Sequence, residues 1–274
     1  MRLSRSAGPA VVTLALAACR APAPVVDPIR PVQPLHLVSE YVVPQGPESS
    51  ALRFGGISGL ASLNDGRDLL GITDDRENSR VYRFEVVAEP PQLRIVPTAT
   101  IRLEASGSAP ASLDPEGIAV TSDGHILISS EGIGNEEPRL PPAILEYSAT
   151  GKFIRQLEVR PRFVPTPRGT VVSGVRANAG FESLTIASDG RLFTATELPL
   201  AQDGDVVPFG PGSRARLLEY RQASGRLRPA REFAYDIDGM DQPPFTPTTA
   251  VNGIVELLAL GGDELLSLER GYAE

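Results

Sequence analysis

One pattern of apolar and polar positions occurs four times between residue 58 and residue 269 of the chain. Each copy has an acidic or small polar residue, a short apolar run, a turn containing glycine, a second apolar run and a second acid. Asp-Gly between two apolar runs favours a two-residue hairpin loop, because both residues tolerate the positive φ of a type I′ turn. The pattern therefore predicts four β-hairpins, with turns at Asp65-Gly66, Asp123-Gly124, Asp189-Gly190 and Gly262-Asp263.

The intervals between these turns have room for a second hairpin each. Such hairpins are predicted to join residues 80–87 to 94–103, and residues 144–147 to 153–159. Four strands per unit, repeated every 40 residues or more, are typical of a β-propeller. A β-sandwich with the same number of strands is the alternative, but it gives no reason for one hairpin to recur with its polar ends preserved. We therefore predict an all-β chain that forms a β-propeller on repeated Asp-Gly hairpins.

The sequence does not determine the number of blades. The chain stops five residues after Glu269, where a further strand would be needed to complete a blade. Either the last blade is incomplete, or a strand at residues 36–43 closes the ring.

Acidic residues lie at equal distances on the two sides of three of the turns. The pairs are Glu116 with Glu131, Glu182 with Glu197, and Glu256 with Glu269. Opposed residues across a two-residue loop have Cβ atoms about 4.5–5.5 Å apart, so each glutamate is predicted to face its pair. The first hairpin is looser, because Ser58 and Asp74 are centred on Gly66 and predict a three-residue loop. The acids lie at the same end of every hairpin and should converge on one mouth of the propeller.

Opposed like charges destabilise a sheet, so the charges of these acids must be neutralised by a hard cation, by shared protons or by arginines. Calcium is favoured over zinc because the group offers only oxygen atoms. The expected ligands are Asp74, Glu116, Glu131, Glu182, Glu197, Glu256 and Glu269. The alternative is a structural ring of glutamate–arginine pairs with no ligand, since Arg76, Arg80, Arg176 and Arg270 lie close to the acids in sequence.

Composition excludes several classes of protein. Gly and Pro number 26 each, which argues against long helices and coiled coils. The net charge of −8 and the single lysine, Lys152, argue against nucleic acid or an anionic membrane surface as a partner. Cys19 is the single cysteine, so a disulfide framework and a cysteine-based zinc site are excluded.

The N-terminus has the form of an export signal. A basic start and a short apolar run predict a signal peptide at residues 1–18, because the run is too short to span a bilayer. Leu-Ala-Ala-Cys at 16–19 resembles a bacterial lipobox, which implies a lipid on Cys19. Ordinary cleavage near Ala18, giving a secreted protein, is the alternative. Residues 19–34 then form a Pro- and Ala-rich tether, residues 35–274 the propeller domain, and the protein is attached to the cell envelope.

Seven segments, in order, resemble the bacterial phytase-like family, which is often labelled "esterase-like activity of phytase". They are GGISGL at 55–60, TDDR at 73–76, LDPEGI at 113–118, SSEG at 129–132, RANAGFE at 176–182, TELPL at 196–200 and LSLERG at 266–271. The resemblance runs from about residue 50 to the end of the chain. It implies a secreted or envelope-attached β-propeller that is distantly similar to calcium-dependent propeller phytases.

The sequence argues against one class of catalytic mechanism, the serine hydrolase. Ser58 is not in a GxSxG elbow, and His125 lies beside a turn roughly 23 Å from the acids, so a Ser-His-Asp triad is not expected. Metal-assisted hydrolysis of a phosphate ester, or of another ester, is the leading hypothesis. Its expected catalytic residues are Glu116, Glu182, Arg176 and Arg76, and its substrate-binding residues are Arg76, Arg176 and Arg270.

The alternative is a propeller lipoprotein that binds a ligand or a protein at the acidic mouth without catalysis. The expected partner is a small molecule, phosphorylated under the leading hypothesis. No nucleic acid is expected, the membrane is contacted only through the lipid, and the protein is expected to be a monomer.

Overall fold

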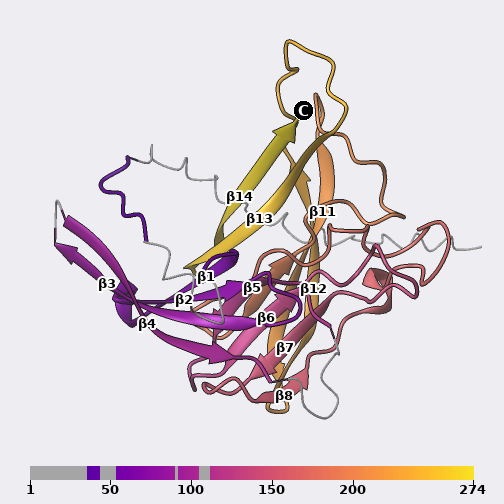
Figure 1. The fold of residues 1–274 in the computed structure, drawn as a ribbon. Helices are drawn as coiled ribbons and strands as arrows, with labels where there is room; N and C mark the ends of the chain where they lie inside the picture. The colour runs from indigo at the N-terminus through magenta and orange to yellow at the C-terminus, as the bar shows by residue number, and fades with distance from the viewer. Residues whose placement is uncertain (1–35, 44–53, 90–91, 105–111) are drawn as a thin grey trace, which may run out of the picture. The chain divides into compact units, whose positions relative to one another are not determined.

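The computed structural model describes residues 36–43, 54–89, 92–104 and 112–274 (Figure 1). The chain divides into a first unit, residues 1–37, and a compact unit, residues 38–274, that holds all the described strands. The predicted signal peptide, Cys19 and the tether lie outside the described residues. Across the described ranges, no helix is long and apolar enough to cross a membrane.

The described residues form four antiparallel sheets in chain order. The first holds β1 (Ile57–Leu63), β2 (Asp68–Thr73), β3 (Arg80–Glu89) and β4 (Gln92–Arg102), and the second holds β5 (Pro115–Val120), β6 (Ile126–Ser130), β7 (Ala143–Tyr147) and β8 (Phe153–Gln156). The third holds β9 (Thr185–Ile186), β10 (Leu192–Ala195), β11 (Ser213–Ala223) and β12 (Arg226–Ile237), and the last is the hairpin β13 (Ala250–Gly261) and β14 (Glu264–Ala273). Each four-stranded sheet is a simple meander, which is the form of a propeller blade.

The predicted fold class is therefore confirmed. The second hairpins are present, as β3 with β4 and as β7 with β8. The last sheet has two described strands, as expected for an incomplete blade. Residues 36–43 form no strand, so the alternative of ring closure by that segment is not observed.

Two of the predicted turns are wrong in detail. Thr121 pairs with His125 and Ala187 with Arg191, so each loop has three residues and not two. Only the glycine of each Asp-Gly takes a positive φ, 84° at both Gly124 and Gly190. This is the three-residue hairpin in which a type I turn is followed by glycine in the left-handed region.

The other two turns differ from each other. Leu63 pairs with Asp68, so the first loop has four residues and includes a 3-10 turn (Asn64–Gly66), where three had been predicted. Gly261 pairs with Glu264, which confirms the two-residue loop Gly262-Asp263.

The sheets stack face to face through their first strands. Strand β1 contacts β5, β5 contacts β9, and β9 contacts β13. Each junction has its own apolar core: Ile72 and Ile128 lie between the first two sheets, Leu127 and Leu192 between the next two, and Phe193 with Leu257 between the last two. This stacking places the beginnings of the first strands close together.

A glycine lies at each junction where two sheets meet most closely. A Cβ on Gly59 would lie 2.4 Å from the carbonyl oxygen of Glu116, and a Cβ on Gly117 would lie 2.8 Å from that of Glu182. A Cβ on Gly253 would lie 2.9 Å from the carbonyl oxygen of Glu197. These glycines let the strand that carries one acid approach the neighbouring sheet.

Gly117→Ala is expected to destabilise the protein by about 1–3 kcal/mol, because the added methyl group would also lie 2.7 Å from the backbone nitrogen of Leu184. The shift of the urea midpoint measures this loss. Gly124→Ala is the control, since its Cβ would meet no atom within 4 Å and only the positive φ is penalised. A Gly117→Ala protein with unchanged stability would contradict the close approach of the two sheets.

Candidate functional site

Three carboxylates meet where the second sheet begins. Asp114 lies directly before β5, Glu116 lies in β5, and Glu131 directly follows β6. One carboxylate oxygen from each lies within 4.8 Å of the others. Glu131 is held beside the other two by its backbone N–H, which donates to the carbonyl of Asp114 at 3.2 Å.

A β-bulge turns Glu116 toward this group. Pro115 pairs with Ser130, but the next pair is Ile118 with Ile128, so Glu116 and Gly117 together oppose one residue. The Gly117 N–H donates to the Ser129 hydroxyl at 2.8 Å in place of a ladder bond. A bulge of this kind redirects a side chain, and it does so here at the start of the strand.

The predicted face-to-face glutamate pairs are therefore wrong. Glu131 lies beyond Ser130, the partner of Pro115, and so does not oppose Glu116. The Glu197 N–H donates to the carbonyl of Gly180, not of Glu182. In the last sheet Glu256 opposes Leu268, because bulges shift that hairpin too. The predicted symmetry counts residues from two-residue turns and ignores the bulges.

Acids from different sheets nevertheless converge. Glu116 hydrogen-bonds to Glu182 of the third sheet, and the charge of Asp74 from the first sheet also acts on Glu116. Glu131 accepts a hydrogen bond from the Gly180 N–H at 3.3 Å. Glu197 acts electrostatically on both Glu131 and Glu182. The acidic group, as we call it, consists of Asp74, Asp114, Glu116, Glu131, Glu182 and Glu197.

Burial is the main cause of raised pKa values in the acidic group. It raises the pKa of Glu116 to about 7, with further contributions from the charges of Asp114 and Asp74. It raises the pKa of Glu131 to about 8 and that of Glu182 to about 9, and each is raised further by neighbouring carboxylates. The pKa of Glu197 is also raised by burial. Without a cation, Glu131 and Glu182 therefore retain their protons at neutral pH.

Two arginines lie at the edge of the acidic group. The Arg76 guanidinium binds Asp114 through two nitrogens, with Nε 2.7 Å from Oδ1. Arg270 lies 3.5 Å from Glu197. The two arginine side chains are 42% and 67% exposed, so both keep N–H groups free to face solvent.

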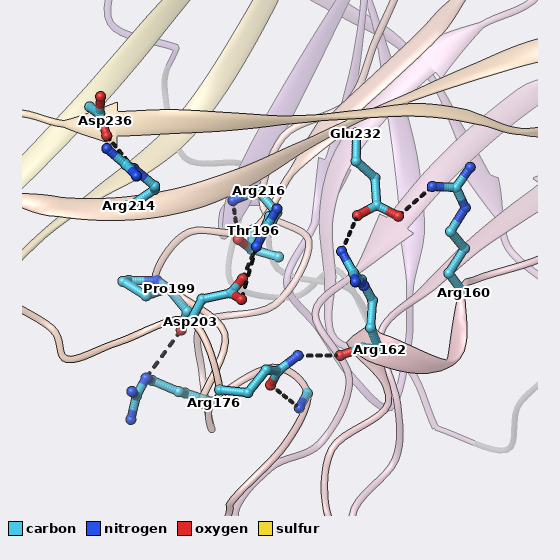
Figure 2. Close-up of polar contacts among 12 residues, drawn as sticks. Arg160, Arg162, Arg176, Thr196, Pro199, Asp203, Arg214, Arg216, Glu232 and Asp236 are labelled. Atoms are coloured by element: carbon cyan, nitrogen blue, oxygen red, sulfur yellow. Dashed lines mark hydrogen bonds and ion pairs between the residues drawn. The ribbon is translucent and has the colours of Figure 1, made fainter.

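Arg176 lies elsewhere. Figure 2 shows its side chain reaching the loop at Pro199, where Nε donates to the carbonyl at 3.1 Å. A second nitrogen donates to the carbonyl of Gly204 at 2.7 Å. Because both partners are backbone carbonyls, Arg176 fixes the 199–204 loop, which directly follows Glu197 and Leu198.

Comparison with known proteins identifies the family of this chain. A model of the phytase-like family, described as "esterase-like activity of phytase", matches residues 52–274. The chain belongs to the phytase-like family. It is also similar to an uncharacterized secreted protein of Arthroderma benhamiae, with 26% identity over 193 residues. The aligned part is 59% of this chain and 35% of that protein, so the chain spans about a third of the relative's length.

Two predicted ligands of this phytase-like chain make other contacts. Glu256 accepts a hydrogen bond from its neighbour, the Leu257 N–H, at 2.9 Å, and burial raises its pKa to about 7. Glu269 accepts hydrogen bonds from the Tyr235 hydroxyl at 2.8 Å and from the Asn252 amide at 2.9 Å. Both acids therefore have partners in or beside the last two sheets.

Asp114 is the member of the acidic group that the symmetry argument missed. It has no counterpart on the other side of the Asp123-Gly124 turn, so counting from the turn does not find it. Its two-residue spacing from Glu116 in LDPEGI was the available signal. Ser58 hydrogen-bonds to Glu116, whereas the sequence pattern placed it opposite Asp74 and gave no sign of a contact with the second sheet.

Arg76→Met is expected to destabilise the phytase-like domain by about 2 kcal/mol at pH 7, because it leaves the buried Asp114 carboxylate without its partner. The matched control is Arg270→Met, for which a loss below about 0.5 kcal/mol is expected from an exposed ion pair. Urea unfolding of both variants measures the difference. Equal losses would contradict the role of Arg76 as the counter-charge of Asp114.

Proposed function

We propose that this phytase-like protein is a calcium-dependent hydrolase of phosphate esters. The observation that carries the proposal is the convergence of Asp114, Glu116 and Glu131, whose oxygen atoms lie within 4.8 Å of one another. Asp114 and Glu131 are buried and Glu116 is partly buried, and three carboxylates at this separation repel one another unless protons or a cation neutralise them.

The residues present fit a hard cation. The donor atoms of the acidic group are all carboxylate oxygens, which suits calcium, and the six residues come from three sheets. In the part of the chain that the structure describes, the hydrogen-bond partners of the Glu116 and Glu131 carboxylates are Ser58, Glu182 and the Gly180 N–H, none of which is basic. Arg76 forms an ion pair with Asp114, and Arg270 forms one with Glu197. The carboxylates of Glu116 and Glu131 therefore remain available to a metal ion.

Asp74, Asp114, Glu116, Glu131, Glu182 and Glu197 are the proposed metal-binding set. A bound calcium ion would polarise a phosphoryl oxygen and lower the pKa of a coordinated water molecule. The exposed N–H groups of Arg76 and Arg270 are suited to bind phosphate oxygens at the edge of the acidic group. Glu116 and Glu182 share a hydrogen bond, so this pair can hold or release a proton beside the substrate. Arg176 is assigned a positioning role through the 199–204 loop.

Net charge gives the metal ion a second role. The chain carries −8, and an acidic surface repels phosphorylated substrates. Cations bound in the acidic group would reverse the local sign and attract them. Removal of calcium should therefore weaken substrate binding as well as slow the chemical step.

The test is calcium titration by calorimetry on residues 20–274, followed by a panel of phosphate-ester and carboxyl-ester substrates. Saturable calcium binding together with calcium-dependent phosphate release supports the proposal. Calcium binding without turnover of any substrate would instead favour a ligand- or protein-binding propeller. Absence of calcium binding would overturn the metal-dependent mechanism.

We also propose that Cys19 carries a lipid and attaches the protein to the cell envelope. The support is the Leu-Ala-Ala-Cys sequence after the predicted signal peptide. Cys19→Ser should move the protein from the membrane fraction to the soluble fraction. Equal membrane association of both forms would contradict lipid attachment.

A further inference from the structure

A cleft lies between the second and third sheets, both of which have four strands. Its outer part is a cavity of about 470 Å³ between residues 155–159, in and after β8, and residues 226–228 of β12. Its inner part is a cavity of about 610 Å³ that reaches the first hairpin turns of the two sheets. Arg155 and Leu227 line both cavities, so the two parts adjoin and form what we call the side cleft.

The outer part of the side cleft is basic. Its lining holds three arginines, Arg155, Arg226 and Arg228, and one acid, Glu158. Arg228 donates to Glu158 at 2.8 Å, but both side chains are more than half exposed, so this ion pair contributes little. The guanidinium of Arg226 is exposed and has no ion-pair or hydrogen-bond partner among the described residues. The side cleft therefore presents positive charge, although the chain carries −8 overall.

The stability of the third sheet does not explain these arginines. Arg228 lies directly opposite Arg221 across β11 and β12, and opposed like charges destabilise a sheet. Glu219 binds Arg221, whereas the ion-pair partner of Arg228 is the exposed Glu158. Unfavourable local pairing of this kind is expected where residues serve a function. The arrangement favours an anion as the occupant of the outer part.

A buried carboxylate orients Arg155 in the wall of the side cleft. Glu146 in β7 accepts a hydrogen bond from Arg155 Nε at 2.5 Å, and His125 Nδ1 lies 2.7 Å from its other oxygen. No described residue binds the two terminal nitrogens of Arg155, and its side chain is 35% exposed. Arginine N–H groups bind the oxygens of a carboxylate or a phosphate with strong, charge-assisted hydrogen bonds. Glu146 thus holds a second anion-binding group between the two cavities.

The inner part of the side cleft has groups that suit hydroxyls. Ser122, Ser188 and Gln222 are exposed in its lining, and within the described ranges their side chains form no hydrogen bond with the protein. Hydroxyl and amide groups can both donate to and accept from a hydroxyl of a ligand. Ile186 and Leu227 add apolar surface to the same lining. A ring that carries several hydroxyl groups fits these walls.

We propose that the side cleft binds an acidic sugar, a ring with several hydroxyl groups and one carboxylate or phosphate. The three arginines bind the anionic group, and the two serines and Gln222 bind the hydroxyl groups. The site is separate from the acidic group, because Glu116 is near the beginning of β5 and Ser122 follows its end. The side cleft is positive without a metal ion, so binding needs no calcium. The inference is independent of the proposed hydrolase activity.

The test is calorimetric titration of residues 20–274 in the presence of a calcium chelator. The probes are glucuronate and glucose 6-phosphate, compared with glucose, acetate and inorganic phosphate. An acidic sugar should bind saturably and about tenfold or more tightly than these three, because each of them lacks either the charge or the hydroxyl-bearing ring. The tighter of the two acidic sugars identifies the anion as a carboxylate or a phosphate. Absence of saturable binding, or equal binding of glucose or of a simple anion, would overturn the proposal.

Variants locate the site. Arg226→Gln/Arg228→Gln should weaken binding of the acidic sugar by about tenfold or more, with an unchanged unfolding midpoint. Arg214→Gln is the matched control, since this arginine of β11 is 62% exposed and lies outside the lining of the cleft. Glu116→Gln/Glu182→Gln should bind the sugar like the parent protein, whether or not it binds calcium. Full binding by the double arginine variant, or loss of binding in either of the other two proteins, would overturn the side cleft as the site.

Discussion

Glu116→Gln/Glu182→Gln should bind no calcium and should be more stable than the parent protein at pH 9 when calcium is absent. Both residues belong to the acidic group, and burial raises the pKa of each well above 4.5. Ionising them costs folding free energy that glutamine avoids, while glutamine keeps a similar shape and hydrogen-bonding capacity. The same change removes two proposed metal ligands.

The expected effect is large. Calcium at about 100 times its dissociation constant stabilises the protein that binds it by about 2.7 kcal/mol, a rise in Tm of about 5 °C or more. The parent protein should show this rise and the double variant should not. Calorimetric titration and thermal unfolding, with and without calcium, measure the two effects.

Glu256→Gln is the matched control. Glu256 is also buried with a raised pKa, but its hydrogen bonds go to the backbone and not to the acidic group. It should retain calcium binding if the acidic group is the site. Loss of binding in the control would extend the site into the last sheet, whereas full binding by the double variant would exclude Glu116 and Glu182 as ligands.

Calcium-free protein should lose stability as the pH rises from about 5 to 9. The pKa values of Glu116, Glu131 and Glu182 are raised in the folded state from 4.5 to about 7, 8 and 9. Between these limits the unfolded chain has released protons that the folded chain still holds, so the free energy of unfolding falls with increasing pH. The stabilisation is complete below pH 4.5 and is lost as the pH passes through the raised values. We expect a fall of at least about 2 kcal/mol.

Calcium should reverse this trend, because it binds carboxylates that have released their protons. Its affinity should rise at least about tenfold between pH 6 and pH 8, with protons released on binding. Titrations in two buffers of different ionisation enthalpy count those protons. Asp75 and Asp203 have lowered pKa values, so their effect on stability changes with pH only near and below pH 3.8, outside the range from pH 5 to 9. Stability that is flat or rises with pH in the absence of calcium would contradict the protonated acidic group.

Local patterns predicted the hairpins well. The strands β5 and β6 follow from two apolar runs around a glycine turn, and Gly124 takes the positive φ that such a turn needs. The second hairpins were predicted because the intervals between these turns have room for them. The loop lengths were less accurate, because one or two extra turn residues leave the apolar alternation unchanged.

The bulges were not predictable from the alternation. A bulge adds one residue to one strand, and its position depends on what the strand meets in space. At Glu116 the bulge accompanies the contact of Gly117 with the backbone of Glu182 and Leu184, which lie in another sheet. Symmetry about a turn therefore paired the wrong residues, although Glu116, Glu131, Glu182 and Glu197, which it selected, do lie in the acidic group.

The sequence by itself determined the all-β class, the hairpin order, the phytase-like resemblance and the acidic ends of the strands, because these depend on residues close together in the chain. Only the tertiary structure decided which acids meet. In the structure, Asp114 lies beside Glu116 and Glu131, and Glu182 reaches Glu116 from the next sheet. Glu269 instead accepts hydrogen bonds from Tyr235 and Asn252. The contacts of Glu182 with Glu116 and of Tyr235 with Glu269 join different sheets, which pack closely at glycines of their first strands. A pattern counted within one hairpin carries no information about that packing.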